Sequence, residues 1–90
     1  MTRPHIRAAA LQFDVTMDPA RNAAVIERLL AGVLADTFAV APEGALSGYV
    51  NEAGLVSRID QAATAAAIER IAAFCVEKRV HLVTGACLNE

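Results

Sequence analysis

Three short apolar runs alternate with two longer amphipathic stretches along this chain. The first run, Ile6 to Phe13, is almost continuously apolar, which is typical of a central strand covered on both faces. The alanines within it would also suit a helix, whereas the bulkier Ile6, Leu11 and Phe13 favour a strand. The second and third runs predict buried strands at Thr37 to Ala41 and at Val80 to Ala86.

The two amphipathic stretches predict helices. The first begins at Asp18-Pro19, where Asp18 suits the N-cap position and Pro19 the first helical position. Its expected apolar face is Val25, Ile26, Leu29, Leu30 and Val33, and its expected polar face is Arg21, Asn22, Glu27 and Arg28. The second begins near Asp60 and ends at Lys78-Arg79, whose positive charge complements the helix dipole. It is expected to bury Ile68, Ile71, Ala72, Cys75 and Val76, and to expose Glu69, Arg70, Glu77 and Lys78.

The elements therefore follow the order β-α-β-α-β, which predicts an α/β fold with parallel strands and right-handed crossovers. Residues 50–58 are expected to form a loop with one loose turn, and no linker marks an internal boundary within residues 1–90. Twenty alanines and four aromatic residues would make a core of small side chains. The third strand would leave an unpaired sheet edge. We therefore expect these residues to be the N-terminal portion of one larger domain.

Composition narrows the choice of partners. A formal net charge of −2 and a pI near 5.6, with scattered basic residues, argue against nucleic acid or an anionic membrane as a partner. The two cysteines, Cys75 and Cys87, lack metal-ligand spacing and are too few for a disulfide framework. Reduced thiols in a cytoplasmic protein are the expectation, and no apolar run is long enough to span a bilayer.

The residues that follow the second strand are the best candidates for chemistry. Pro42 has no N–H to donate and stops strand pairing, so Glu43 falls where the strand gives way to a loop. Gly44 and Gly48 on either side allow backbone angles that other residues resist. Ligands of open α/β sheets bind just beyond the carboxyl ends of the strands, which makes Glu43 a candidate functional carboxylate.

Several segments together resemble the nitrilase superfamily of carbon–nitrogen hydrolases. The most specific are Ala41-Pro42-Glu43 and Leu46-Ser47-Gly48-Tyr49, which are similar to the family's Pro-Glu motif and its downstream Gly-Tyr. The strand Arg7 to Asp14, the helix from Asp18 through Asn22 and Ile26, and the segment His81 to Gly85 also resemble family elements. The resemblance spans nearly all ninety residues, which correspond to about the first third of a family domain. It implies a β-α-β-α-β unit that forms the N-terminal part of an α-β-β-α sandwich.

The resemblance also implies a Glu-Lys-Cys triad that hydrolyses a non-peptide C–N bond in an amide, carbamoylated amine or nitrile. Glu43 matches the general base, which takes the proton of a cysteine thiol that then forms an acyl-enzyme. Such a base should titrate near neutrality, and partial burial is one way in which the pKa of a carboxylate is raised. Tyr49 is a candidate to line the substrate pocket, with simple packing an equal alternative. No metal or organic cofactor is implied, and a homo-oligomer of the full-length parent is expected.

The other two members of the triad are expected outside residues 1–90. Lys78 lacks the family's lysine motif, Cys75 has the spacing of a core residue, and Cys87 lacks the aromatic and acidic residues that follow the family's nucleophile. We therefore predict that the 90-residue chain is inactive alone.

The remaining polar candidates have weaker claims to a function. Gln12, Asp14, His5 and His81 are better explained by structure, and Glu90 matches a family acid only weakly. Two alternatives stay open: a catalytically inactive relative, and a small α/β binding or interaction module. A dinucleotide-binding version of that module would need a G-x-G-x-x-G loop, which does not follow the first strand.

Overall fold

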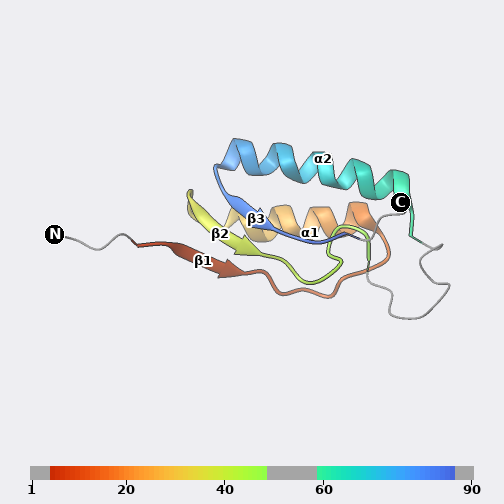
Figure 1. Cartoon of the computed structure of the whole chain (residues 1–90), viewed down its shortest axis with the longest axis horizontal. Coiled ribbons are helices and arrows are strands. Elements are labelled where there is room, and N and C mark those ends of the chain that lie inside the picture. The colour runs from red at the N-terminus through yellow and green to blue at the C-terminus, as the bar shows by residue number, and fades with distance from the viewer. Residues whose placement is uncertain (1–4, 49–58, 87–90) are drawn as a thin grey trace.

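Three strands and two helices alternate in the computed structural model, which describes residues 5–48 and 59–86 (Figure 1). The elements are β1 (Arg7–Ala10), α1 (Pro19–Ala31), β2 (Thr37–Val40), α2 (Gln61–Lys78) and β3 (His81–Val83). The predicted order β-α-β-α-β and the α/β class are confirmed. The loop and loose turn expected at residues 50–58 lie outside the described residues.

The three strands form one parallel sheet in the order β1-β2-β3. Ala8 pairs with Phe38, and Phe38 with His81; one pleat further on, Ala10 pairs with Val40, and Val40 with Val83. In the part of the sheet that the structure describes, the central strand is β2, so the prediction of a central strand at residues 6–13 is wrong. Regular pairing there ends at Ala10, although the Leu11 amide still donates to the Val40 carbonyl at 2.8 Å.

Both helices lie on the same side of the sheet, where they pack against each other (Figure 1). Side chains on that side form the core, which includes Leu11, Ala23, Ile26, Leu30, Ala39, Leu46, Ala67, Ile71 and Val80. Along β2, Thr37 and Ala39 are buried against the helices, whereas Phe38 and Val40 remain 45% and 52% exposed. Within the described residues the sheet is therefore covered on one face only, which differs from the coverage on both faces expected for residues 6–13.

The uncovered face carries two rows of side chains across the three strands. One row is Ala8, Phe38 and His81, in which the Phe38 and His81 rings stack with centroids 4.5 Å apart and planes 14° apart. The other row is Ala10, Val40 and Val83. We call these two rows the open face. Its largely apolar composition is that of a sheet surface that normally packs against other protein.

The helix starts agree with the sequence. Asp18 accepts a hydrogen bond from the Arg21 amide at 3.2 Å, and Asp60 accepts one from the Ala63 amide at 2.9 Å. Both predicted N-caps are therefore confirmed. No helix among the described residues is long and apolar enough to cross a bilayer.

Polar contacts made by Arg70 and Lys78 of α2 join the two helices at their surface. Arg70 on α2 donates to both carboxylate oxygens of Glu27 on α1, at 2.6 and 3.0 Å, and this hydrogen bonding raises the pKa of the guanidinium. Lys78 Nζ donates to the Ala31 carbonyl at 3.2 Å, at the C-terminal end of α1. These bonds connect the helices side by side, and exposed pairs of this kind contribute little to stability.

The predicted helix faces need three corrections. Val76 is 79% exposed and Ala72 is also exposed, because the buried stripe of α2 runs through Thr64, Ala67 and Ile71. Val76 lies roughly 140° around the helix from Ile71 and therefore points away from α1 and the sheet. Asn22, expected on the polar face of α1, is buried.

Candidate active site

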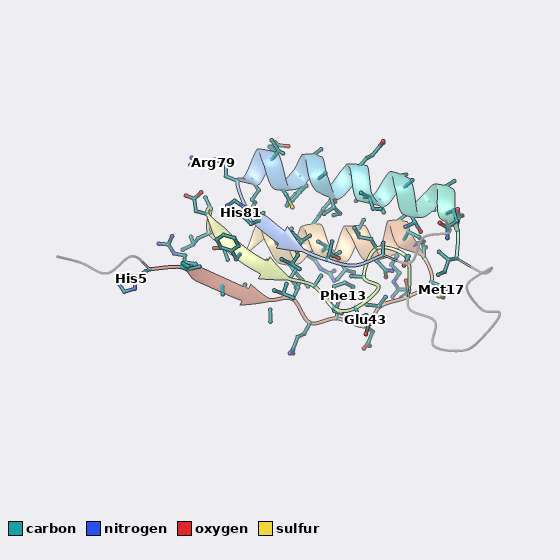
Figure 2. The ribbon with its side chains drawn as sticks, viewed as in Figure 1. His5, Phe13, Met17, Glu43, Arg79 and His81 are labelled. Atoms are coloured by element: carbon teal, nitrogen blue, oxygen red, sulfur yellow. The ribbon has the colours of Figure 1, made fainter. Side chains whose placement is uncertain are left out.

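Glu43 lies where β2 leaves the sheet, at the end where all three parallel strands finish (Figure 2). The Ala41 amide still donates to the Val83 carbonyl at 3.0 Å, and Pro42, which has no amide proton, ends the pairing. The predicted position of Glu43 at a strand exit agrees with the structure. Its side chain is exposed to solvent in this structure.

The chain turns sharply directly after Glu43. The Ala45 amide donates to the Pro42 carbonyl at 3.2 Å, and the Ser47 and Gly48 amides both donate to the Gly44 carbonyl, at 3.1 and 2.8 Å. Gly44 has a φ of 66° and Gly48 a φ of 92°, both in the region that favours glycine. We call residues 42–48 the Glu43 turn. Its internal bonds hold the backbone of Glu43 in one position.

The Glu43 turn is fixed against the end of β3. The Leu46 amide donates to the Gly85 carbonyl at 3.3 Å, and a Cβ added to Gly85 would lie 3.6 Å from the Gly44 amide nitrogen. Ala45, Leu46 and Ser47 are buried within the turn. An exposed carboxylate thus stands on a turn whose other side chains are packed inward.

The segment that leaves β1 supports the turn from the other side. A Cβ added to Gly48 would lie 2.5 Å from Met17 Sδ and 3.0 Å from the Thr16 carbonyl oxygen. Thr16 is itself bonded to the buried Asn22 of α1. Phe13 lies on the same segment, at the same end of the sheet as Glu43 (Figure 2). The sequence carries no local signal for the role of Thr16. Helical spacing placed Asn22 on the polar face of α1, so its burial was not expected.

The lysine and the described cysteine lie toward the other end of the helices. Lys78 and Cys75 are both in the last turns of α2, which lead into the start of β3, and Lys78 is bonded to the end of α1. Cys75 is half-buried beside an apolar pocket of about 200 Å³ that Leu46, Leu82 and Thr84 also line. Burial raises the pKa of the Cys75 thiol, which disfavours the reactive thiolate.

The structure describes four other candidate residues, two histidines and two polar residues after β1. His81 stacks on Phe38 on the open face, toward the amino ends of the strands, and His5 is exposed just before β1 (Figure 2). Gln12 and Asp14 are exposed on the segment after β1. Tyr49, Cys87 and Glu90 lie outside the described residues.

Within residues 5–48 and 59–86, no three His, Cys, Asp or Glu side chains are grouped so that they could hold a metal ion. No family model, curated protein or solved structure matches this chain. The geometry of the site indicates its chemistry. Glu43 is a solvent-facing carboxylate on a turn that contacts the segments leaving β1 and β3. It can accept a proton from a group that is brought to it.

Proposed function

We propose that this chain supplies the general base of a carbon–nitrogen hydrolase, with Glu43 as that base. The observation that carries the proposal is the Glu43 turn itself. It presents a carboxylate at the carboxyl ends of parallel strands, while the backbone around it is bonded to Gly44 and Gly85. The resemblance of the Pro42-Glu43 and Gly48-Tyr49 segments to the nitrilase superfamily supports the same assignment.

In the proposed reaction, the Glu43 carboxylate accepts the proton of a cysteine thiol. The thiolate attacks the carbonyl carbon of an amide or carbamoylated amine, and the nitrogen leaves after taking the proton back from Glu43. The same carboxylate then takes a proton from a water molecule that attacks the acyl-enzyme, and it returns this proton to the departing cysteine sulfur as the acid is released. A lysine stabilises the negative charge on the substrate oxygen. In this proposal the cysteine and lysine come from outside residues 1–90, because Cys75 and Lys78 lie in the last turns of α2 and Cys87 lacks the residues that follow the family's nucleophile.

The same proposal places the sheet in an α-β-β-α sandwich. The helices already cover one face, and the open face presents Phe38, Val40 and Val83 with 45–61% of each residue exposed. This chain would supply one helix layer and one sheet layer, and a second sheet with its own helices, packed on these side chains, would supply the other two. The open face is also the one observation that favours the second candidate function, a module whose role is to bind another protein.

The test is to express the reading frame that contains codons 1–90 together with any codons that continue it. The protein is then mixed with a panel of amides, carbamoylated amines and nitriles, and its intact mass is followed. The proposal predicts turnover of at least one class and a transient mass increase equal to one acyl group on a cysteine. A stop codon at position 91, or a longer protein that turns over none of the panel, would favour the interaction module.

The 90-residue chain gives a complementary result. Alone it should turn over none of these substrates, because a general base without its nucleophile cannot form an acyl-enzyme. Turnover by the purified 90-residue chain that disappeared in Glu43→Gln would contradict the assignment of the nucleophile to another segment.

A further inference from the structure

Asn22 makes three hydrogen bonds to a single residue that lies six positions earlier in the chain. Its Oδ1 accepts from the Thr16 amide at 2.9 Å and from the Thr16 hydroxyl at 2.8 Å, and its Nδ2 donates to the Thr16 carbonyl at 2.7 Å. Asn22 is only 1% exposed. Its amide orientation is fixed by the partners, since a backbone N–H must face the oxygen and a backbone carbonyl must face the nitrogen.

These bonds are not needed to start α1. Asp18 already caps the helix by accepting from the Arg21 amide, and its own carbonyl accepts the Asn22 amide at 3.0 Å. The Asn22 side chain instead fixes the segment between β1 and α1. A buried polar side chain that makes three hydrogen bonds to one short segment holds that segment in place.

The Thr16 carbonyl is where this segment meets the Glu43 turn. The oxygen that accepts from Asn22 Nδ2 is the same atom that would lie 3.0 Å from a Cβ on Gly48. Met17 closes the contact, because its Cα would lie 3.1 Å from that Cβ. Only a residue without a side chain allows the two backbones to approach this closely.

Gly48 in turn is bonded to the residue that follows Glu43. The Gly48 amide donates to the Gly44 carbonyl at 2.8 Å. A continuous series of contacts therefore runs from Asn22 through Thr16, Gly48 and Gly44 to Glu43. We propose that Asn22 is a positioning residue, which sets the place of the Glu43 turn against the exit of β1. Its value for catalysis rests on the proposed function of Glu43; its effect on the turn does not.

The first test compares Asn22→Leu with Thr64→Val by amide hydrogen exchange. Leucine keeps the size of Asn22 but removes all three bonds. Thr64 is also fully buried, and its hydroxyl donates to the Asp60 carbonyl at 2.7 Å before α2, so Thr64→Val removes a comparable bond away from the turn. In Asn22→Leu the protection of the Ser47 and Gly48 amides should fall about tenfold more than that of the Val80 amide. In Thr64→Val the protection of the Ser47, Gly48 and Val80 amides should change by about the same factor.

A readout of Glu43 itself separates positioning from general stability. The backbone amide resonance of Glu43, measured by nuclear magnetic resonance at one fixed pH, should shift in Asn22→Leu and stay at its wild-type position in Thr64→Val. Asn22→Gln, which carries the same amide on a longer side chain, should restore part of the protection. Equal protection losses at Gly48 and Val80 in folded Asn22→Leu, with an unmoved Glu43 resonance, would overturn the proposal.

If Asn22→Leu does not fold, the contact can be tested from the opposite side. Gly48→Ala places a methyl group against the Thr16 carbonyl, so the side-chain amide protons of Asn22 should shift and exchange faster with solvent. Unchanged Asn22 signals in that variant would contradict the proposal. The two proposals can fail separately. If Asn22→Leu alters the exchange of the turn but Glu43→Gln in the longer reading frame keeps full turnover, Asn22 still positions the turn and Glu43 is not the general base.

Discussion

Residues with a positive φ occur at both ends of the sheet, but the residue types differ between the two ends. At the carboxyl end, the left-handed positions are glycines, Gly44 and Gly48. At the amino end, they are ordinary residues: Asp36 has a φ of 64° and Arg79 a φ of 62°. The Asp36 amide donates to the Arg79 carbonyl at 2.6 Å, and their side chains form an exposed ion pair at 3.8 Å.

The difference lies in the space around each residue. A Cβ on Gly48 would meet the backbone of Thr16, whereas Asp36 and Arg79 are exposed and carry their side chains into solvent. The amino end therefore tolerates backbone strain of about 1 kcal/mol per residue, while at Gly48 the carboxyl end leaves no room for a Cβ unless the neighbouring backbone shifts. Because backbone packs directly against backbone at Gly48, the carboxyl end is the end at which the position of the chain is fixed.

The largest expected effect comes from adding a methyl group at the carboxyl end. Gly48→Ala should lower the free energy of unfolding by about 2–4 kcal/mol, because the new Cβ meets the Thr16 carbonyl and the φ of 92° is unfavourable for alanine. Urea unfolding followed by circular dichroism measures the change.

Gly32→Ala is the matched control for that variant. Gly32 ends α1 with a φ of −88°, and a Cβ added there would lie 3.7 Å from the Leu29 carbonyl oxygen, an ordinary van der Waals contact. The free energy of unfolding should change by no more than about 0.5 kcal/mol. If Gly48→Ala and Gly32→Ala lowered the free energy of unfolding equally, the carboxyl end would not be more closely packed than the amino end.

A smaller effect of opposite sign is expected at the amino end. Arg79→Gly should raise the free energy of unfolding by about 0.5–1 kcal/mol, because glycine adopts the left-handed C-cap conformation without strain. The lost ion pair with Asp36 is exposed and long, so it offsets little of this gain. Arg28→Gly, the same replacement within α1, should instead lower the free energy of unfolding by about 1 kcal/mol. Thermal unfolding of both variants gives the comparison.

The smallest effect concerns the Cys75 thiol, also toward the amino end. Burial raises the pKa of this thiol in the folded chain above its value in the unfolded chain. The thiol therefore contributes stability that is fully present below the unfolded pKa and is lost as the pH rises through the folded pKa. Cys75→Ala should flatten the decline of the unfolding midpoint above about pH 9, the ordinary range of a thiol. An identical decline in both proteins would contradict this assignment.

Local signals in the sequence predicted the parts of the fold that depend on neighbouring residues. Asp18 and Asp60 were recognisable as N-caps because capping involves only the next three residues. Pro42 marked the end of β2 for a similarly local reason. The position of Glu43 at a strand exit followed from these two facts and the alternation of elements.

The features that the sequence missed depend on contacts between distant segments. The burial of Asn22 is set by the path of the chain around Thr16, and helical spacing alone placed it on the wrong face. Val76 was expected in the core because it is apolar, but α2 is rotated so that Thr64 and Ile71 face inward. The exposure of Phe38 depends on what covers the open face, which the order of elements does not specify.

The most direct test of the central claim is the activity of Glu43→Gln in the protein made from the continued reading frame. Glu69→Gln is the control, because Glu69 is an exposed carboxylate on α2 and has no part in the proposed chemistry. With a primary amide as substrate, Glu43→Gln should lower kcat by about 10²–10⁴-fold, the usual contribution of a general base, while Glu69→Gln retains wild-type turnover. Wild-type turnover by Glu43→Gln would contradict the claim that this carboxylate is the base.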